Sequence, residues 1–515
     1  MKFFNSINEL NQDLKIENEL SSDELSQVLE ISFHFKLSVD RQTELESLVN
    51  SGVVLTPEEL FHKFSVSSSE VDGLIKFLFE SGFTNIRKSF DNCTVFASGT
   101  LDIISRSLRC KISKVRQESS QSFVVSSVPS LPNSISLNID SINGLQPLIE
   151  YKKNFNRENR ISFLKRFREN KFQKLVNYSR PYLVDAIKSA YNSLNVQHDG
   201  RGQTIGILID RFPNSADMIR FWKLNGQPIF TSRITNINVN NNRIEPPNGE
   251  ETLDAQWTSG IATGARINIY ATGVLTFSAV ERGLDRIFQD VLRNPSLRQI
   301  SISLGIGERM LTPGELLSKN DKYLRLRALG VNIFVSSGDS GSHPSGVLQV
   351  EFPASNPNVI SVGGTNLNIN GNGTLISESA WSKSGGGQSY VYQKQSYQNA
   401  LSGLFRIVPD VAAVGDQSTG VCVVLNGLVY QFGGTSVGAP IWAGFCAIIN
   451  SARASQGKKP IGFLLPHLYS LMNTQNFRDI KSGNNGQYPS ITGHDMVTGL
   501  GTPNIQNLIS ALINL

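Results

Sequence analysis

Ser436 lies where a serine can act as a nucleophile. It belongs to GGTSVGAPIWAG, residues 433–444. The strand-like run GLVYQF precedes Gly433 and Gly434, and a helical pattern follows them. A hydroxyl in the first turn of a helix is at the positive end of the helix dipole, which stabilises a developing anion. This segment alone does not favour a nucleophile over an ordinary helix-capping serine.

Glu250 and Asp254 could take the proton of such a serine. They are four residues apart in a helical pattern that follows PPNG, residues 246–249, so they share one face of the helix. Two adjacent carboxyls favour a shared proton, and the pair accepts a proton in acid, where histidine is already charged. The alternative interpretation is a solvent-facing acidic turn that complements the helix dipole.

Asp339 is a third candidate acid, in SSGDSGSH after the strand-like run VNIFVSS. Sites in parallel α/β sheets form beyond the carboxyl ends of strands, and Asp339 has that position. An Asx-type turn between Gly338 and Gly341 is the alternative interpretation.

Asp479 and Asp495 lie in two glycine-rich loops, FRDIKSGNNG and ITGHDMVTGLGTPN. Such loops expose backbone carbonyls, and carboxylate and carbonyl oxygens are the ligands that calcium takes. The spacing is not that of an EF-hand, so calcium and turn-forming aspartates both remain open.

The elements around these residues predict two domains. A chain of 515 residues is too long for one core. Residues 20–127 mix short helical and strand-like segments, which indicates a compact α+β module. From Gln203 onward, β-rich runs alternate with helical ones, which predicts a doubly wound, mostly parallel sheet with helices on both faces.

Charge and apolar runs exclude several classes of function. The net charge is +5, but residues 152–174 alone contain nine Lys or Arg and two Asp or Glu. This concentration favours a basic connector over a nucleic-acid-binding surface. The longest apolar stretch, around 439–449, is shorter than the ~18 residues of a spanning helix. The four cysteines form no C-x-x-C motif, and buried thiols or a Cys93–Cys110 pair are both compatible with the sequence.

Six segments in a fixed order carry a family resemblance: GEETLD, SSGDSG, FPASNPNVISVGGTNL, WSKSGGGQS, VPDVAA and GGTSVGAP. They resemble the sedolisin, or serine-carboxyl peptidase, family and are most similar to kumamolisin-type enzymes. LTPEELFHKFSVSSSEVDGLIKFLFESGF resembles their activation prodomain, and PYLVDAIKSAYN resembles the start of their mature enzyme.

The resemblance implies a subtilisin-like fold and an acid-acting endopeptidase or tripeptidyl peptidase, made as a self-processing zymogen. It places the nucleophile on Ser436, the base on Glu250, the supporting acid on Asp254 and the oxyanion-hole acid on Asp339. It also implies one structural Ca²⁺ site. The implied calcium ligands are the side chains of Asp479 and Asp495 and the carbonyls of Ile480, Ile491 and Gly493.

The resemblance also suggests how the chain is organised. We expect an activation prodomain at 1–150, a basic linker with the processing site at 151–177, and the catalytic domain at 178–515. The prodomain would inhibit its own enzyme, substrates would be proteins or peptides, and the enzyme would be a monomer without a nucleic-acid or membrane partner. We expect an extracellular or acidic location, although the N-terminus has no apolar run of signal-peptide length.

Three positions depart from the family pattern. Leu304 stands where the family has tryptophan in S-W-G, Ile209 where it has glutamate, and His494 where a tryptophan precedes the calcium aspartate. These departures leave two rival hypotheses: a non-catalytic peptide-binding paralogue, and a serine hydrolase with a histidine base, for which His343 is the nearest candidate by motif.

Overall fold

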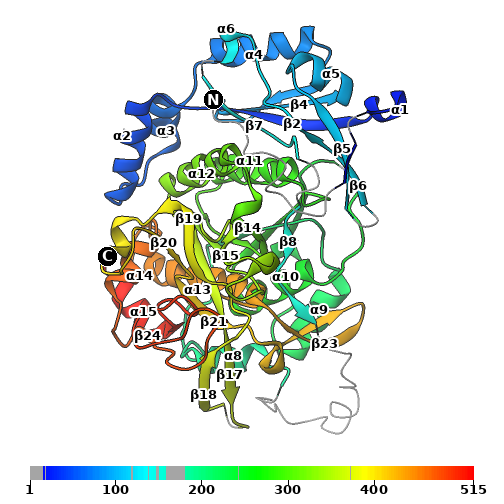
Figure 1. Cartoon of the computed structure of the whole chain (residues 1–515). Coiled ribbons are helices and arrows are strands. Elements are labelled where there is room, and N and C mark those ends of the chain that lie inside the picture. Colours follow the sequence, from blue (N-terminus) through cyan, green and yellow to red (C-terminus); the bar gives the residue numbers. More distant parts are fainter. Residues whose placement is uncertain are drawn as a thin grey trace. The chain divides into compact units, whose positions relative to one another are not determined.

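The computed structural model describes residues 15–17, 19–117, 120–136, 138–146, 150–157, 180–241, 243–371 and 373–515. Residues 158–177 of the expected basic linker lie outside the described residues. Contacts divide the chain into two compact units (Figure 1). Unit 1 takes residues 1–151, 274–292 and 309–329, and unit 2 takes residues 152–273, 293–308 and 330–515.

Unit 1 contains the expected α+β module. Its four-stranded antiparallel sheet has the order β3 (Thr84–Lys88), β4 (Thr94–Thr100), β2 (Val28–Phe35) and β7 (Ile139–Asn143). Its N-terminal helices are α2 (Val39–Asn50), α3 (Pro57–Phe64), α4 (Ser68–Glu80) and α5 (Leu101–Ser107). Helix α3 begins where the sequence requires, because Thr56 and Glu59 form a capping box around Pro57.

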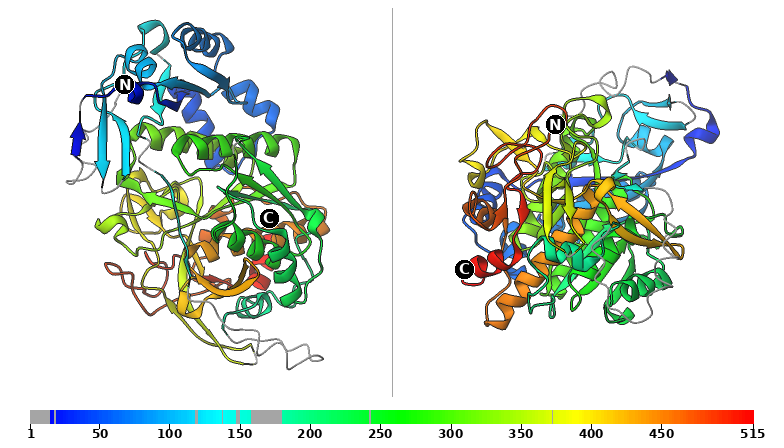
Figure 2. Two further views of the ribbon diagram at one scale, coloured as in Figure 1. Left: turned by 90° about the vertical axis from the view of Figure 1, so that its right-hand side faces the viewer. Right: turned by 90° about the horizontal axis from the view of Figure 1, so that it is seen from below.

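Two later helices also belong to unit 1: most of α11 (Phe277–Arg293), and α12 (Pro313–Ala328). In Figure 2 these green helices run beside the blue and cyan elements of the unit. Their contacts with the sheet are polar and buried. Ser32 of β2 donates to Glu281 (2.7 Å), and Asn143 of β7 donates to Ser318 (2.8 Å).

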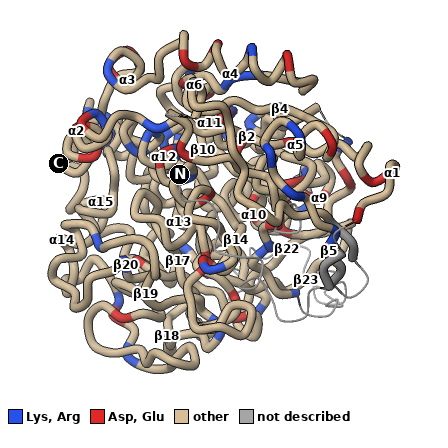
Figure 3. The backbone as a smooth tube through the Cα atoms, turned by 45° about the horizontal axis from the view of Figure 1, so that its top comes forward, with Lys and Arg blue, Asp and Glu red and all other residues tan. Residues whose placement is uncertain are grey.

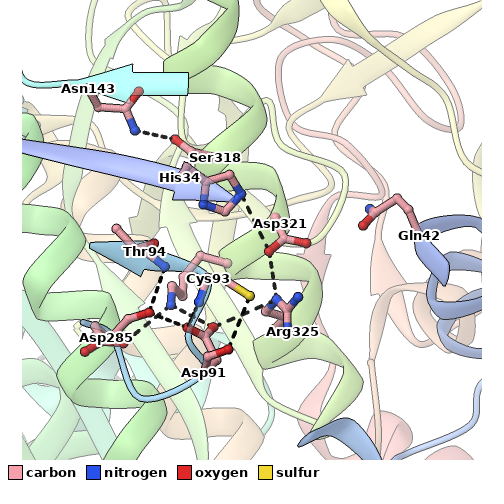
Figure 4. Close-up of polar contacts among 12 residues, drawn as sticks. His34, Gln42, Asp91, Cys93, Thr94, Asn143, Asp285, Ser318, Asp321 and Arg325 are labelled. Carbon is pink, nitrogen blue, oxygen red and sulfur yellow. Dashed lines mark hydrogen bonds and ion pairs between the residues drawn. The ribbon is translucent and has the colours of Figure 1, made fainter. Parts of the chain in front are cut away.

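The same interface holds buried ion pairs, most of which Figure 4 draws. Lys322 lies 3.0 Å from Asp91 and 3.5 Å from Asp285. Asp321 lies 2.7 Å from Arg325 and 3.8 Å from His34. Because buried charges are costly without partners, this pairing makes the position of α12 within the unit specific.

Unit 2 contains the expected parallel sheet. Its strands have the order β11 (Ile234–Asn238), β12 (Arg266–Ala271), β10 (Thr204–Ile209), β13 (Leu297–Ile302), β15 (Asn332–Ser336), β17 (Ile360–Ile369) and β18 (Leu375–Ala380), and β21 (Val411–Val414) also pairs with β17. Every pair is parallel except β17 with β18. All of β10 is buried, as expected for the centre of such a sheet.

Helices and loops at the carboxyl ends of these strands position the candidate residues. Helix α10 (Glu250–Ile261) packs against α13 (Thr435–Ser455), and α13 lies on β13, β15 and β17. Asp339 follows β15, and Ser436 follows β23 (Leu428–Gly433). The sequence-based expectation that the site forms beyond strand ends agrees with this placement.

The structure shows how charged residues and cysteines are distributed along the chain. Lys and Arg are interspersed with Asp and Glu along the described chain in Figure 3. No helix among the described residues is long and apolar enough to cross a membrane. All four cysteines are buried and free, so Cys93 and Cys110 do not form the disulfide that the sequence left open.

Candidate active site

Ser436 is the second residue of α13 and is fully buried. The helix starts after Gly434, whose φ of 118° is a conformation that favours glycine. A Cβ on Gly434 would come within 2.4 Å of the Asn154 carbonyl oxygen and 2.7 Å of Asp339 Oδ2. Glycine is therefore needed here for the turn, and also because the Asn154 and Asp339 oxygens lie too close to this position for a side chain.

The backbone N–H of Ser436 forms a regular hydrogen bond, whereas its hydroxyl group does not. Its N–H donates to the carbonyl oxygen of Asn154 at 3.1 Å. Its Oγ forms no hydrogen bond of regular geometry within the described part of the chain. An N–H that donates to a carbonyl oxygen beside a serine hydroxyl is the arrangement expected of a serine that attacks that carbonyl group.

Glu250 and Asp254 form the buried carboxyl pair, both fully inaccessible to solvent. Helix α10 begins at Glu250 because Glu251 accepts the N–H groups of Asn248 (2.9 Å) and Gly249 (2.8 Å) and so caps the helix start. Asp254 accepts from Ser303 Oγ at 2.8 Å. Among the described residues, neither oxygen of Glu250 has a regular hydrogen bond.

Burial dominates the titration of this pair. It raises the pKa of Glu250 well above its ordinary value, and the charge of Asp254 raises it further. The Ser436 hydroxyl and the Lys153 ammonium act in the opposite direction on the Glu250 pKa. Burial also raises the pKa of Asp254. Because the two charges would repel, the pair favours a shared proton.

Asp339 is held beside the N-terminus of α13. Its Oδ1 accepts from the N–H (2.8 Å) and hydroxyl (2.9 Å) of Thr435, and its Oδ2 accepts from Asn156 Nδ2 (2.9 Å). Burial raises the pKa of Asp339 to about 7, although the Thr435 hydrogen bonds oppose that rise. Asp339 is therefore protonated in acid and able to donate a hydrogen bond.

Residues 152–157 lie across this site as two short strands. Strand β8 (Lys152–Lys153) pairs antiparallel with β14 (Leu304–Gly307), and β9 (Asn156–Arg157) pairs antiparallel with β23. Asn154 stands between them with its carbonyl at Ser436. A segment that adds a strand on each side of a nucleophile is bound as an extended peptide substrate is.

The side chain of Asn154 enters a polar recess. Its amide donates to Ser336 Oγ and to Glu351 Oε2, each at 3.1 Å. Glu351 is buried, and burial together with the charge of Asp339 raises its pKa to about 8. A Cβ on Gly305 would lie 2.0 Å from Glu351 Oε2, so Gly305 leaves the space that this carboxyl fills.

Comparisons with known proteins identify the family of the chain. Residues 22–148 match the pro-kumamolisin activation domain, and residues 236–467 match the subtilase family. The chain is 28% identical to kumamolisin of Bacillus sp. (strain MN-32), over 94% of this chain and 92% of that protein. The chain belongs to the sedolisin family. It is a serine-type peptidase with an N-terminal prodomain.

Two further relatives show the extent of the similarity. Sedolisin of Pseudomonas sp. (strain 101) is 26% identical, over 89% of this chain and 81% of that protein. The solved structure of Pseudomonas sedolisin, a serine-carboxyl proteinase complexed with two molecules of pseudo-iodotyrostatin, has a TM-score of 0.58 at 27% identity. It covers 64% of this chain and 96% of that chain.

Two of the three departures from the sedolisin pattern, Leu304 and Ile209, are buried apolar residues. Leu304 lies in β14, opposite Lys153, and Ile209 ends β10. Neither side chain can form hydrogen bonds with the acids, and Asp254 uses Ser303 instead. His343 is exposed and contacts Ser342 Oγ at 2.8 Å. Within the described residues, no histidine hydrogen-bonds to Ser436, so the histidine-base hypothesis has no geometric support.

The five expected calcium ligands lie in one group of loops. Gly493 N–H donates to both oxygens of Asp479, at 3.2 and 3.1 Å. Asp495 accepts from Ile491 N–H at 3.1 Å and from Ser490 Oγ at 2.8 Å, and Ser490 Oγ also donates to the Ile480 carbonyl. The donor types suit calcium, but here hydrogen donors engage these oxygens, and an ion would compete with them. Calcium binding stays a prediction.

Sequence reasoning missed the residues that complete the cleft. Asn154 and Lys153 had been assigned only to a basic connector, and Glu351 had no apparent role. Glu351 directly precedes Phe352 and Pro353 in one of the motifs that carry the resemblance. The position of Glu351 next to that motif was the only sequence signal of its place in the site, because Asn154, its hydrogen-bond partner, is distant in the sequence.

Proposed function

We propose that this protein is an acid-acting serine-carboxyl peptidase that is made as a self-processing zymogen. Ser436 is the nucleophile, Glu250 the general base, Asp254 its supporting acid and Asp339 a donor in the oxyanion hole. The observation that carries the proposal is the hydrogen bond from the Ser436 N–H to the Asn154 carbonyl, beside a buried carboxyl pair.

The reaction follows from these positions. Ser436 Oγ attacks the carbonyl carbon while Glu250 takes its proton. The carbonyl oxygen becomes an oxyanion, which accepts hydrogen bonds from the Ser436 N–H and from protonated Asp339. The C–N bond then breaks, and Glu250 returns the proton to the leaving amine. Water, deprotonated by Glu250, hydrolyses the acyl-enzyme and regenerates the serine.

Acid dependence is built into these roles. Asp339 must carry a proton to donate to an oxyanion, and burial holds its pKa at about 7. Glu250 must be ionised to accept a proton, and the proton shared with Asp254 allows one of the pair to be charged in acid. The active form therefore exists in a window that closes as the pH rises past about 7.

In the zymogen, residues 152–157 occupy the cleft, so the first substrate is the chain itself. The bond presented to Ser436 is Asn154–Phe155, within the linker that we expected at 151–177. Until it is cut, this segment excludes other peptides, which makes the prodomain and its linker an intramolecular inhibitor. An enzyme with this pH window would work in an extracellular or intracellular acidic environment. We further propose that calcium binds at Asp479 and Asp495.

The activity of the processed chain on a denatured protein, measured from pH 3 to 8, tests the proposal. Wild type should be active only in acid. The rate of Glu250→Gln should be lower by a factor of ~10²–10⁴, because the general base is removed. Glu245→Gln, at an exposed acid in the preceding loop, is the matched control and should keep wild-type activity. A neutral optimum would contradict the carboxylate base, and no turnover by wild type would favour the peptide-binding paralogue.

A further inference from the structure

The ammonium group of Lys153, in the segment that occupies the cleft, has three polar partners. Its Nζ lies 2.7 Å from Asp210 Oδ1, 2.8 Å from Asn248 Oδ1 and 3.7 Å from Glu251 Oε2. Only 11% of the Lys153 side chain is exposed, and the two carboxylate side chains are 8% and 0% exposed. The ammonium is thus held in a nearly closed acidic pocket, which we call the Asp210–Glu251 pocket.

The position of this pocket along the cleft is defined by strand geometry. Lys153 directly precedes Asn154, whose carbonyl faces Ser436. Successive side chains of an extended strand point to opposite sides. Asn154 accordingly points to Ser336 and Glu351, whereas Lys153 points to the end of β10 and the start of α10. The pocket therefore receives the side chain just N-terminal to the residue that is acylated.

No other cation of the described chain replaces Lys153 at the two oxygens that face it. Glu251 Oε1 is used by Asn248, Gly249 and Thr252, but its Oε2 has no hydrogen bond. Asp210 Oδ2 contacts Arg211 Nε at 3.1 Å, and Arg211 also donates to the Pro246 carbonyl. Among the described residues, Asp210 Oδ1 contacts only Lys153. When the linker leaves, two largely buried carboxylate oxygens lose their partner, which is costly.

We propose that the enzyme selects substrates with lysine or arginine immediately before the acylated residue, and that Asp210 and Glu251 are the residues that read this charge. This inference rests on the proposed function and names its substrate class. Neither acid touches the reacting atoms, so both are specificity-determining residues rather than catalytic ones.

The bound cation also acts on the carboxyl pair. The charge of Lys153 lowers the pKa of both Glu250 and Asp254, while Glu251 raises that of Asp254. A basic substrate residue in the Asp210–Glu251 pocket therefore favours the ionised form of the base. Its effect is expected in kcat as well as in KM, and the acid-side limb of the profile should move to lower pH with a basic substrate.

Quenched-fluorescence peptides with the sequence of residues 150–157 test the specificity. The residue corresponding to Lys153 is lysine, norleucine or glutamate in three otherwise identical peptides. In processed wild type, norleucine should lower kcat/KM by ~10–100-fold, because a charge-assisted hydrogen bond is lost, and glutamate should lower it further. Norleucine in place of the exposed Lys152 is the matched control and should have little effect. The acid-side limb should lie at higher pH for the norleucine peptide.

Asp210→Asn should reduce the preference for lysine over norleucine, measured as the ratio of kcat/KM for the two peptides. Equal cleavage of the lysine and norleucine peptides by wild type would overturn the inference without affecting the proposed function, since both would still be hydrolysed. An unchanged preference in Asp210→Asn and in Glu251→Gln would overturn the assignment of the pocket.

A second measurement does not depend on catalysis. In full-length Ser436→Ala, Lys153→Met should lower Tm, whereas Lys152→Met should not and Lys153→Arg should restore it. Equal Tm for Lys153→Met and its parent would contradict the pocket even if the protein had no peptidase activity. Failure of the proposed function and failure of this inference are thereby distinguishable.

Discussion

The backbone N–H of Ser436 donates to the carbonyl oxygen of Asn154 across 3.1 Å. This one contact joins the start of α13 to a segment that precedes it by more than half of the chain. It places the carbonyl group of Asn154 beside Ser436, and the strand pairing on each side positions the flanking residues along the cleft. The roles of Lys153, Asn154 and Asn156 in the cleft all follow from it.

Asp339→Asn should extend activity toward neutral pH. Asparagine donates a hydrogen bond without needing the proton that Asp339 loses near its pKa of about 7. The neutral-side limb of kcat/KM should therefore move to higher pH, whereas Asp339→Ala should lose ~10²–10³ of the rate at the acid optimum. If the neutral-side limb of Asp339→Asn lies at the same pH as that of wild type, a group other than Asp339 confines the enzyme to acid.

Gly434→Ala should abolish activity. A methyl group there would occupy the space of the substrate carbonyl and would strain a residue with a φ of 118°. Gly457→Ala is the matched control, since Gly457 also has a positive φ (70°) but open space around its Cα. It should cost only ~1 kcal/mol of stability and keep full kcat/KM. If both variants lose a similar amount of activity, backbone strain is the cause, and not the methyl group in the space of the substrate carbonyl.

Glu351→Gln should stabilise the full-length Ser436→Ala protein at alkaline pH. Burial raises the pKa of Glu351 from 4.5 to about 8, so the folded state holds this proton more tightly than the unfolded state does. The resulting stability is complete below pH ~4.5 and is lost as the pH rises through 8. Glutamine does not titrate, and the Tm of the variant relative to its parent should rise between pH 5 and 9. If the difference in Tm between the variant and its parent stays constant from pH 5 to 9, the pKa of Glu351 is not raised.

Calcium should raise the Tm of the full-length Ser436→Ala protein, because a ligand that binds only the folded state stabilises it by mass action. A chelator should reverse this increase. Asp479→Asn removes one expected carboxylate ligand and should respond much less to calcium or to the chelator. If neither calcium nor the chelator changes Tm, the expected site does not bind the ion.

The sequence predicted the architecture because periodicity and helix signals are local. The alternation of apolar runs after Gln203 predicted the parallel sheet, and the glycines before Ser436 predicted a turn into α13. Asp339 was found for the same reason, by its place after a strand. Each of these signals lies within about a dozen residues, where backbone preferences and burial leave a readable pattern.

The cleft contacts could not be read in this way. The partners of Lys153 are 57 and 98 positions away, at Asp210 and Glu251, and only tertiary folding brings them together. No local sequence signal distinguishes Glu251, whereas in the structure it caps α10 and faces Lys153. Charge complementarity between distant residues leaves no periodic pattern in the sequence, so it cannot be predicted from the sequence alone.

The order in which the full-length protein is cut tests the central claim most directly. Purified wild type is transferred to acid, and new N-termini are identified by mass spectrometry over time. We expect Phe155 to be the first new N-terminus, its rate of appearance to be independent of protein concentration, and Ser436→Ala not to form it. A first cut at any other bond, or formation of the Phe155 N-terminus by Ser436→Ala at the wild-type rate, would contradict the account.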